Sequence, residues 1–302
     1  MTYLLRTAWG LCGAAAAALV AGAGAPAGPT YRLVENWAQL PPGVHWGVMT
    51  AVSVDANDNV FTFQRSEPTS KVMVFDAHGK YLREWGENAF TYPHGLRVLR
   101  DGLVWIADRQ MQQILKYDAN GRLLMSLGQK GVAGDNNSTD KFNGASDVVT
   151  ASNGDIFVSD GEGGNSRVVK FSSNGTFIMA WGTKGAGHGQ LNTPHNIAMD
   201  SKGRLWVCDR GNKRLQLFDH DGTYLDQMRQ FGTPAAIFIS KDDVVFVAAS
   251  EPENRVTIGT IDGNVLSTIE GLNYPHGIAV DGTGAVYVAE SFGKAVLKFV
   301  RQ

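Results

Sequence analysis

The chain has 302 residues, with 27 Lys and Arg against 29 Asp and Glu, so its net charge is −2. Such a balance argues against a nucleic-acid partner, because affinity for phosphate backbones needs an excess of basic residues. Charged residues make up 19% of the chain, apolar residues 43%, and glycine contributes 36 residues. Few charges, many glycines and ample apolar content predict an all-β protein with tight turns and a large core.

The first 25 residues read as an export signal. Arg6 supplies a positive charge, Leu11–Val20 supplies a short apolar run, and Ala21-Gly22-Ala23 or Ala23-Gly24-Ala25 supplies a small-residue cleavage site. The run is too short and too rich in Ala for a stable membrane span after processing, although a retained anchor is an alternative. We therefore expect a secreted or periplasmic protein, with residues 26–302 as the mature chain.

Removal of residues 1–25 changes the charge and the cysteine content. The loss of Arg6 leaves 26 basic residues (27 − 1) against 29 acidic ones, a net charge of −3. Cys208 is then the only cysteine, so no internal disulfide is expected. Export without disulfides fits a bacterial periplasmic or secreted protein better than a small disulfide-stapled domain.

A repeat fills the mature chain. Its frame is small–apolar–x–apolar–Asp/Asn, then Gly–x–apolar–aromatic–Val–x–Asp, and its spacing of roughly 40 to 50 residues is typical of four-stranded propeller blades. Second strands such as Val104-Trp105-Ile106-Ala107 are continuous apolar runs, fit for burial between blades. The sequence thus predicts a six-bladed β-propeller over residues 26–302. Its units begin near Met49, Pro93, Ala145, Pro194, Pro234 and Pro275.

The sixth unit ends at Gln302 without a fourth strand of its own. Thr30–Val34, near the mature N-terminus, has the pattern of a strand and is expected to fill that edge. Such an exchange closes the ring and covers an unpaired strand. The alternative is an open array of repeats.

Three histidines follow prolines at the start of alternate units. They are His94 in Tyr92-Pro93-His94, His195 in Thr193-Pro194-His195 and His276 in Tyr274-Pro275-His276. The same position in the other units holds Thr50, Ser146 and Ala235. Alternate blades of a closed ring lie about 120° apart, so the imidazoles should converge on the central channel. Three histidines with an open coordination position form the protein part of a catalytic metal site, and zinc is the expected metal. The alternative is that each histidine hydrogen-bonds within its own loop.

A second recurring position follows the second strand, where the chain should turn at the channel mouth. Arg65 and Arg210 at this position are suited to grip a substrate carboxylate in bidentate fashion. Arg109 shares the position, but a bridge to Asp108 or Asp209 is an equal alternative for it. The recurring Asp108, Asp160 and Asp209 are expected to be hydrogen-bond acceptors for turns. The full set of equivalent residues is Arg65, Arg109, Gly161, Arg210, Ser250 and Ser291.

Other site motifs are missing from the sequence, which has no Gly-rich phosphate loop, CxxC pair or G-x-S-x-G elbow.

The repeat frame is similar to the NHL repeat. The three Pro-His motifs, with Phe63-Gln64-Arg65, Val158-Ser159-Asp160-Gly161, Asn165-Ser166-Arg167 and Asp209-Arg210, resemble the catalytic core of the peptidyl-α-hydroxyglycine α-amidating lyases, or peptidylamidoglycolate lyases. The resemblance covers about residues 31–300.

The resemblance implies a role for individual residues. It implies that His94, His195 and His276 bind a catalytic zinc and that Arg65 and Arg210 orient the substrate. It also implies a structural calcium bound partly by the main-chain oxygens of Val52 and Leu96.

The chain departs from the family pattern at two positions of the site. Glu162 stands where the family has a catalytic tyrosine, and Gly277 stands where it has a calcium-binding aspartate. The family's disulfides are absent too. These departures put the tyrosine-dependent step and the calcium site in question.

Two classes of function follow from these residues. The first is a metal-dependent lyase that cleaves the C–N bond of an α-hydroxyglycine amide to an amide and glyoxylate, with Glu162 as the proton acceptor. The second is an exported NHL propeller that keeps the metal for binding and lacks the lyase chemistry. A related lyase or hydrolase for another small substrate is a third option. The expected partner is a small molecule or peptide with a terminal carboxylate, and we expect a monomer.

Glu162 itself has two interpretations. It either replaces the tyrosine as base or is a solvated loop residue. In the second case metal-bound hydroxide, Tyr92 or Tyr274 would take the proton.

Overall fold

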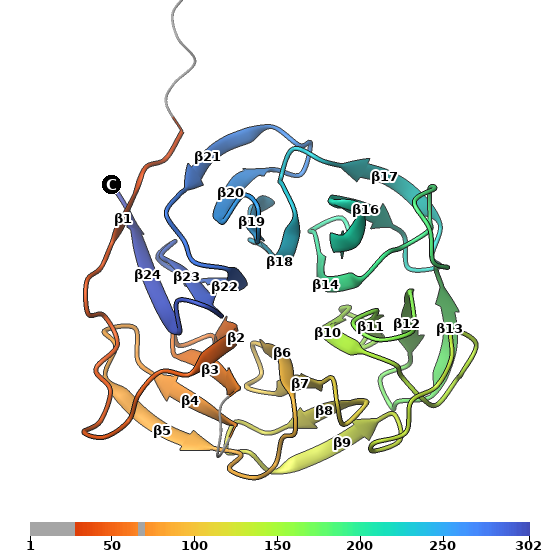
Figure 1. Ribbon diagram of the computed structural model, residues 1–302, viewed down its shortest axis with the longest axis horizontal. Helices are drawn as coiled ribbons and strands as arrows, with labels where there is room; N and C mark the ends of the chain where they lie inside the picture. The colour runs from red at the N-terminus through yellow and green to blue at the C-terminus, as the bar shows by residue number, and fades with distance from the viewer. Residues whose placement is uncertain (1–27, 66–69) are drawn as a thin grey trace, which may run out of the picture.

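The computed structural model describes residues 28–65 and 70–302 and is a six-bladed β-propeller (Figure 1). Six antiparallel four-stranded sheets surround a central channel, and within the described residues the helical structure is a 3-10 turn, η1 (Arg210–Asn212). The predicted all-β fold and six blades are confirmed. The predicted export signal lies outside the described residues. Among the described residues, no helix has the length and apolarity needed to cross a membrane.

Each blade has its first strand at the channel and its last strand at the rim (Figure 1). The inner strands are β2 (Val48–Val54), β6 (Pro93–Val98), β10 (Ala145–Thr150), β14 (Pro194–Met199), β18 (Pro234–Ile239) and β22 (Pro275–Val280). The second strands are β3 (Val60–Arg65), β7 (Val104–Asp108), β11 (Ile156–Asp160), β15 (Leu205–Asp209), β19 (Val244–Ala249) and β23 (Val286–Glu290). The third strands are β4 (Lys71–Phe75), β8 (Gln113–Tyr117), β12 (Arg167–Phe171), β16 (Arg214–Phe218), β20 (Arg255–Thr260) and β24 (Ala295–Arg301). The outer strands are β5 (Tyr81–Trp85), β9 (Leu123–Leu127), β13 (Phe177–Trp181), β17 (Tyr224–Met228), β21 (Val265–Ile269) and β1 (Tyr31–Leu33).

Burial follows the position of a strand within its blade. All five residues of β7 are buried, because its sheet is covered on both faces by the neighbouring blades. The rim strand β5 instead alternates between partly buried and exposed residues, since only one of its faces packs inward. Apolar clusters therefore lie between blades, such as the one in which Phe63 of β3 packs with Ile106 of β7.

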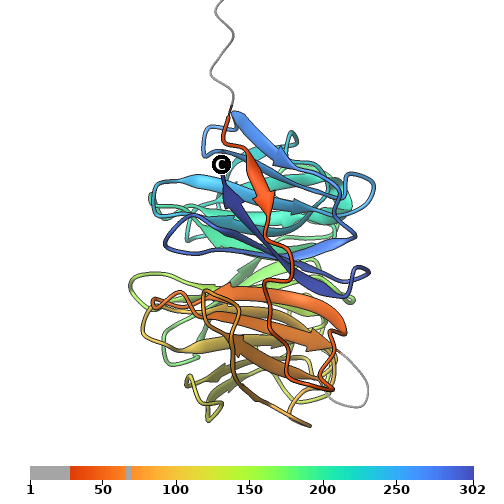
Figure 2. The same cartoon turned by 90° about the vertical axis from the view of Figure 1, so that its left-hand side faces the viewer.

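The N-terminal strand closes the ring. β1 pairs antiparallel with β24, with Tyr31 opposite Arg301 and Leu33 opposite Phe299. In Figure 2 the two strands lie side by side although they come from opposite ends of the chain. This confirms the predicted exchange, which covers the edge of β24 that the sixth blade would otherwise expose.

A β-bulge begins every inner strand. The pairing with the second strand shifts register after the first or second residue of the inner strand, for example between Pro275 and Gly277 and between Pro194 and Ile197. A bulge changes the direction in which a side chain points. The residue after each of these prolines is a histidine, and its ring is directed into the channel.

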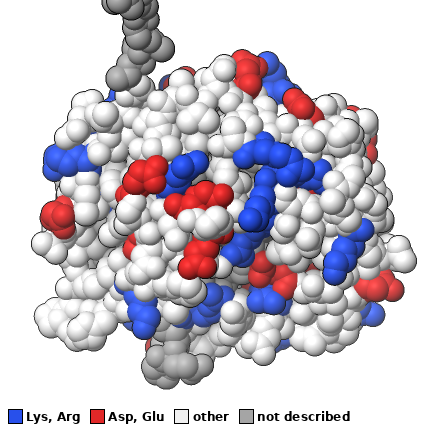
Figure 3. All heavy atoms as spheres, turned by 45° about the horizontal axis from the view of Figure 1, so that its top comes forward, with Lys and Arg blue, Asp and Glu red and all other residues white. Residues whose placement is uncertain are grey.

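Charges of both signs are interspersed on the face shown in Figure 3, and uncharged residues cover most of it. This distribution agrees with the near-neutral composition.

Removal of the closing strand should destabilise the ring. Tyr31 and Leu33 pack against the core between the fifth and sixth blades. A chain starting at residue 36 should lose about 3 kcal/mol of stability, which lowers Tm by about 6–12 °C. Thermal unfolding of this truncation, compared with a chain starting at residue 28, tests the prediction. Equal Tm values would show that β1 does not hold the ring closed.

Candidate metal centre

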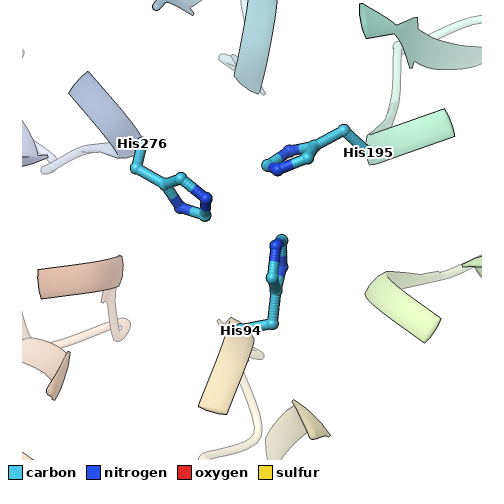
Figure 4. A group of neighbouring side chains, drawn as sticks. All are labelled: His94, His195 and His276. Carbon is cyan, nitrogen blue, oxygen red and sulfur yellow. The ribbon is translucent and has the colours of Figure 1, made fainter. Parts of the chain in front are cut away.

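The three predicted histidines meet at the channel axis. His94 comes from β6, His195 from β14 and His276 from β22, and Figure 4 shows their rings converging from alternate blades. Their ligand atoms all lie within 4.8 Å of one another. Each side chain is at most 8% exposed. The structure thus brings together three imidazoles in the arrangement expected of a metal site.

Each imidazole is fixed by the following blade along the ring. The Nδ1 of His94 lies 2.9 Å from the carbonyl oxygen of Ser146, that of His195 lies 2.6 Å from Ala235, and that of His276 lies 2.8 Å from Thr50. A carbonyl oxygen only accepts, so each Nδ1 carries the hydrogen and each Nε2 keeps its lone pair. This arrangement fixes the tautomer that binds a metal through Nε2.

The electrostatic environment keeps the rings neutral. Burial lowers the pKa of His94, and it lowers the pKa of His195 and His276 well below the usual range, with the neighbouring imidazoles adding to the effect. The Nε2 of His195 is buried without a hydrogen-bond partner among the described residues. A neutral, unpartnered imidazole nitrogen that faces two others fits a divalent metal ion.

Buried acids at the ends of the second strands position the loops before two of the histidines. The Asp108 carboxylate accepts hydrogen bonds from the backbone N–H groups of Thr91 and Tyr92, and Asp209 accepts one from Asn192. Asp160 does the same for Asn143. These bonds confirm the predicted role of the three aspartates as turn acceptors.

Glu162 lies beside the histidines rather than in solvent. Its carboxylate oxygens are 3.5 Å from Nε2 of His195 and 3.9 Å from Nε2 of His94, and its side chain is 14% exposed. The backbone N–H groups of Gly161 and Glu162 both bond to the carbonyl of Gly144. Gly163 packs so tightly against Asn143 that a Cβ there would lie 2.4 Å from the Asn143 carbonyl oxygen. The glycines of this loop therefore hold Glu162 against the centre.

Three arginines surround the same space. Arg210 Nη1 lies 3.7 Å from Oε1 of Glu162, and Arg109 Nη1 lies 3.6 Å from Oε2. The guanidinium of Arg65 stacks 4.0 Å above the ring of Tyr92, and burial lowers its pKa. Arg210 donates a hydrogen bond to the hydroxyl of Tyr274. The structure thus places both predicted arginines near the centre.

Arg109 is a site residue that the sequence left undecided. It contacts Glu162 and lies 5.5 Å from the centre of the Tyr92 ring, and no ion pair to Asp108 or Asp209 is found within residues 28–65 and 70–302. The sequence signal for a place in the site was that Arg109 occupies the repeat position equivalent to Arg65 and Arg210.

A cavity of about 220 Å³ lies in the channel beside the three histidines, which form part of its lining. Val52 and Leu96 line it, as do the equivalent Ile237 and the acidic Asp147. The residues that line this cavity form the inner layer of the channel, and Arg97 of β6 extends across it. Its Nη2 lies 2.6 Å from Asp147 Oδ2, 3.1 Å from Asn196 Oδ1 and 2.6 Å from the carbonyl oxygen of Ile197.

The residues of this layer do not fit the calcium ion that the resemblance implies. Calcium needs several oxygen ligands with carboxylates among them. Asp147 is the carboxylate that lines the cavity within the described parts of the chain, and Arg97 already binds it. The Arg97 guanidinium also binds the carbonyl of Ile197, which occupies the same place in its blade as Val52 and Leu96 in theirs. A positive side chain thus stands in the layer where the calcium was expected.

Comparison with known proteins gives the family. The NHL-repeat sequence profile matches residues 90–117, 142–171 and 191–218. NHL repeat-containing protein 3 of Homo sapiens is 34% identical over 293 residues, covering 89% of this chain and 84% of the human protein. The chain belongs to the NHL-repeat family represented by that protein.

Other relatives of this NHL propeller carry enzyme names. A probable peptidyl-alpha-hydroxyglycine alpha-amidating lyase of Caenorhabditis elegans is 26% identical, over 82% of this chain and 81% of that protein. Among solved structures, a streptogramin B lyase superposes with a TM-score of 0.63 at 14% identity, covering 91% of this chain and 98% of that one. The structural likeness shows the shared fold.

The first prediction from this geometry concerns the metal content. The NHL propeller purified without chelators should hold about one transition metal per chain, and His195→Ala should lose most of it, because two imidazoles bind more weakly than three. Elemental analysis measures both. His188→Ala is the control, since His188 stacks on Tyr224 in an exposed loop away from the centre. Equal metal content in the His195→Ala protein would contradict the assignment.

The second prediction concerns Arg97. Arg97→Met leaves Asp147, which is 1% exposed, without its ion-pair partner. Loss of one partner from a buried ion pair costs about 3–5 kcal/mol, so chemical denaturation should show a drop of this size. Arg100→Met, an exposed arginine after the same strand, is the control. The parent's unfolding midpoint should not respond to added calcium or to a calcium chelator; a clear calcium-dependent shift would contradict the fit described above.

Proposed function

We propose that the chain is a metal-dependent lyase that cleaves the C–N bond of an α-hydroxyglycine amide and releases an amide and glyoxylate. The observation that carries the proposal is the meeting of three neutral imidazoles with an acid and two arginines at one end of the channel. The amidating-lyase names of two relatives support it. A divalent metal bound by the imidazoles would supply Lewis-acid polarisation of a substrate oxygen.

The arginines account for recognition of the substrate carboxylate. Arg210 and Arg109 approach the Glu162 carboxylate from two sides, at 3.7 and 3.6 Å, so the same guanidinia can hold an incoming carboxylate. The hydroxyl of Tyr274 fixes Arg210, and the ring of Tyr92 lies against Arg65. These contacts orient the guanidinia before substrate arrives, which reduces the entropy lost on binding.

Glu162 is placed to move the proton. In the reaction the hydroxyl loses its proton, its C–O bond becomes the carbonyl of glyoxylate, the C–N bond breaks, and the amide nitrogen takes up a proton. Glu162 can accept the first proton and return it to the nitrogen, so that the carboxylate is regenerated. Its two oxygens face the imidazoles and the arginines, the side on which the hydroxyl and carboxylate of the substrate would lie.

A specific observation keeps the binding protein as a second candidate. The Glu162 carboxylate occupies the space between Arg109 and Arg210 where a substrate carboxylate would be held. If it stays there, the propeller would capture a ligand by other contacts and would not turn it over. Binding of an α-hydroxyglycine peptide without glyoxylate release would favour this candidate.

The proposal includes the setting of the protein. We propose an exported monomer, secreted or periplasmic, that takes a small molecule or peptide with a terminal carboxylate. The predicted signal sequence supports export, and a single cysteine in residues 26–302 fits a bacterial periplasmic or secreted protein better than a small disulfide-stapled domain.

Glyoxylate release from a benzoyl-capped α-hydroxyglycine tests the activity. The zinc-loaded parent should release glyoxylate, and Arg210→Met should lower kcat/KM about 10–100-fold, because one charged contact to the carboxylate is lost. Arg229→Met is the control, because this arginine is exposed and its side chain bonds only to the Asn212 carbonyl among the described residues. A metal-loaded parent that releases no glyoxylate above background would refute the lyase proposal.

A further inference from the structure

The Glu162 carboxylate lacks the hydrogen bonds that an enclosed anion usually has. Its side chain is 14% exposed, yet no hydrogen bond to it is found in the described part of the chain, and its nearest positive groups stand 3.6 and 3.7 Å away. These separations exceed the usual length of a charge-assisted hydrogen bond, about 2.7–2.9 Å. Removal of a carboxylate from water is costly unless a cation or donors replace the water.

The two oxygens face the centre in a regular pattern. Oε1 lies 3.5 Å from Nε2 of His195 and 3.7 Å from Arg210, and Oε2 lies 3.9 Å from Nε2 of His94 and 3.6 Å from Arg109. Each oxygen therefore stands between an imidazole nitrogen and a guanidinium. The imidazole nitrogens offer no hydrogen to the carboxylate, because the hydrogen of each ring is on Nδ1.

The separation between Glu162 and His195 matches that of two ligands that share one metal. With bonds of about 2.0–2.1 Å to nitrogen and oxygen, two ligand atoms of a tetrahedral ion lie about 3.4 Å apart. The contact between Glu162 and His195 is 3.5 Å and the contact with His94 is 3.9 Å, while no contact of Glu162 with His276 within 4.0 Å is found among the described residues, so its side chain would move towards His276 on binding the metal. The unpartnered Nε2 of His195 is a second, independent sign that these atoms face a common cation.

We propose that Glu162 is the fourth protein ligand of the metal, so that the resting centre is a three-histidine, one-glutamate site. This deepens the proposed function, on which its catalytic meaning rests. It assigns the chain a carboxylate ligand at the position where the family it resembles has a tyrosine. A small ligand with a hydroxyl and a carboxylate would bind by displacing Glu162.

The loop limits how that displacement occurs. The bonds from Gly161 and Glu162 to Gly144, and the contact of Gly163 with Asn143, fix the backbone. The carboxylate can therefore leave by rotation of its own side chain, without movement of the loop. Rotation frees Arg109 and Arg210 for the substrate carboxylate and leaves Glu162 free to take a proton. Glu162 would thus bind the metal in the absence of substrate and accept a proton when substrate is bound.

Cobalt spectroscopy of Glu162→Cys tests the ligand assignment through a gained signal. If residue 162 reaches the metal, a cysteine thiolate there should give a thiolate-to-cobalt charge-transfer band in the near ultraviolet. The parent should lack the band, because its Cys208 is buried within the fourth blade. A Glu162→Cys protein that holds cobalt and shows no such band would overturn the proposal.

Glu162→Gln provides a second measurement that does not depend on the cysteine variant. Its cobalt affinity, measured by chelator competition, should fall at least about 10-fold, and its visible cobalt spectrum should change. Glu87→Gln, an exposed glutamate, is the matched control. If Glu162→Gln abolishes glyoxylate release while cobalt affinity and spectrum stay those of the parent, Glu162 is a base and not a ligand. If the parent has no lyase activity, yet Glu162→Cys gains the band and Glu162→Gln loses cobalt affinity, the ligand assignment stands and the lyase proposal is refuted.

Discussion

The centre depends on hydrogen bonds that cross from one blade to the next. Each imidazole comes from one blade and is held by a backbone carbonyl of its neighbour, over sequence separations of 52, 40 and 226 residues. The last of these bonds joins the sixth blade to the first, so it exists only in a closed ring. Closure by β1 and the geometry of the metal centre are therefore linked, although β1 lies at the rim.

Small residues at the intervening positions make this arrangement possible. Thr50, Ser146 and Ala235 supply the carbonyl groups that bind the imidazoles, and their side chains leave the axis free. A bulky side chain at any of them would take the space in which the three rings meet. The alternation of histidine with a small residue is thus a packing requirement as well as a pattern of ligands.

Charge is distributed along the channel in layers. The imidazole layer is neutral because burial lowers the pKa of each ring. On one side of it stand Glu162 and the arginines, and on the other the Arg97–Asp147 pair. In the inner layer the positive charge beside Asp147 is supplied by Arg97 of the chain itself. In the Glu162 layer the arginines lie 3.6 and 3.7 Å from the carboxylate, farther than Arg97 lies from Asp147, so this layer remains able to respond to a metal or a substrate.

Repetition made much of the fold predictable. Apolar second strands, glycine turns and the missing sixth outer strand predicted the number of blades and the closing segment. His94, His195 and His276 could be identified because equivalent positions of a ring must meet at its axis. Arg65 and Arg210 followed from the same equivalence, whereas Arg109 could not be separated from a bridging role, since its direction depends on local packing.

Two features were decided only by the tertiary structure. Arg97 follows the histidine repeat by three residues, and nothing local to it reveals that its guanidinium reaches Asn196 and Ile197, 99 and 100 residues away. Glu162 is in a glycine-rich loop that reads as solvated, yet the bonds of that loop to Gly144 turn it over the imidazoles. The sequence by itself determined what the repeat imposes on every blade. The tertiary structure decided the contacts that single residues make across blades, because those contacts depend on the closed ring and have no counterpart in the repeat.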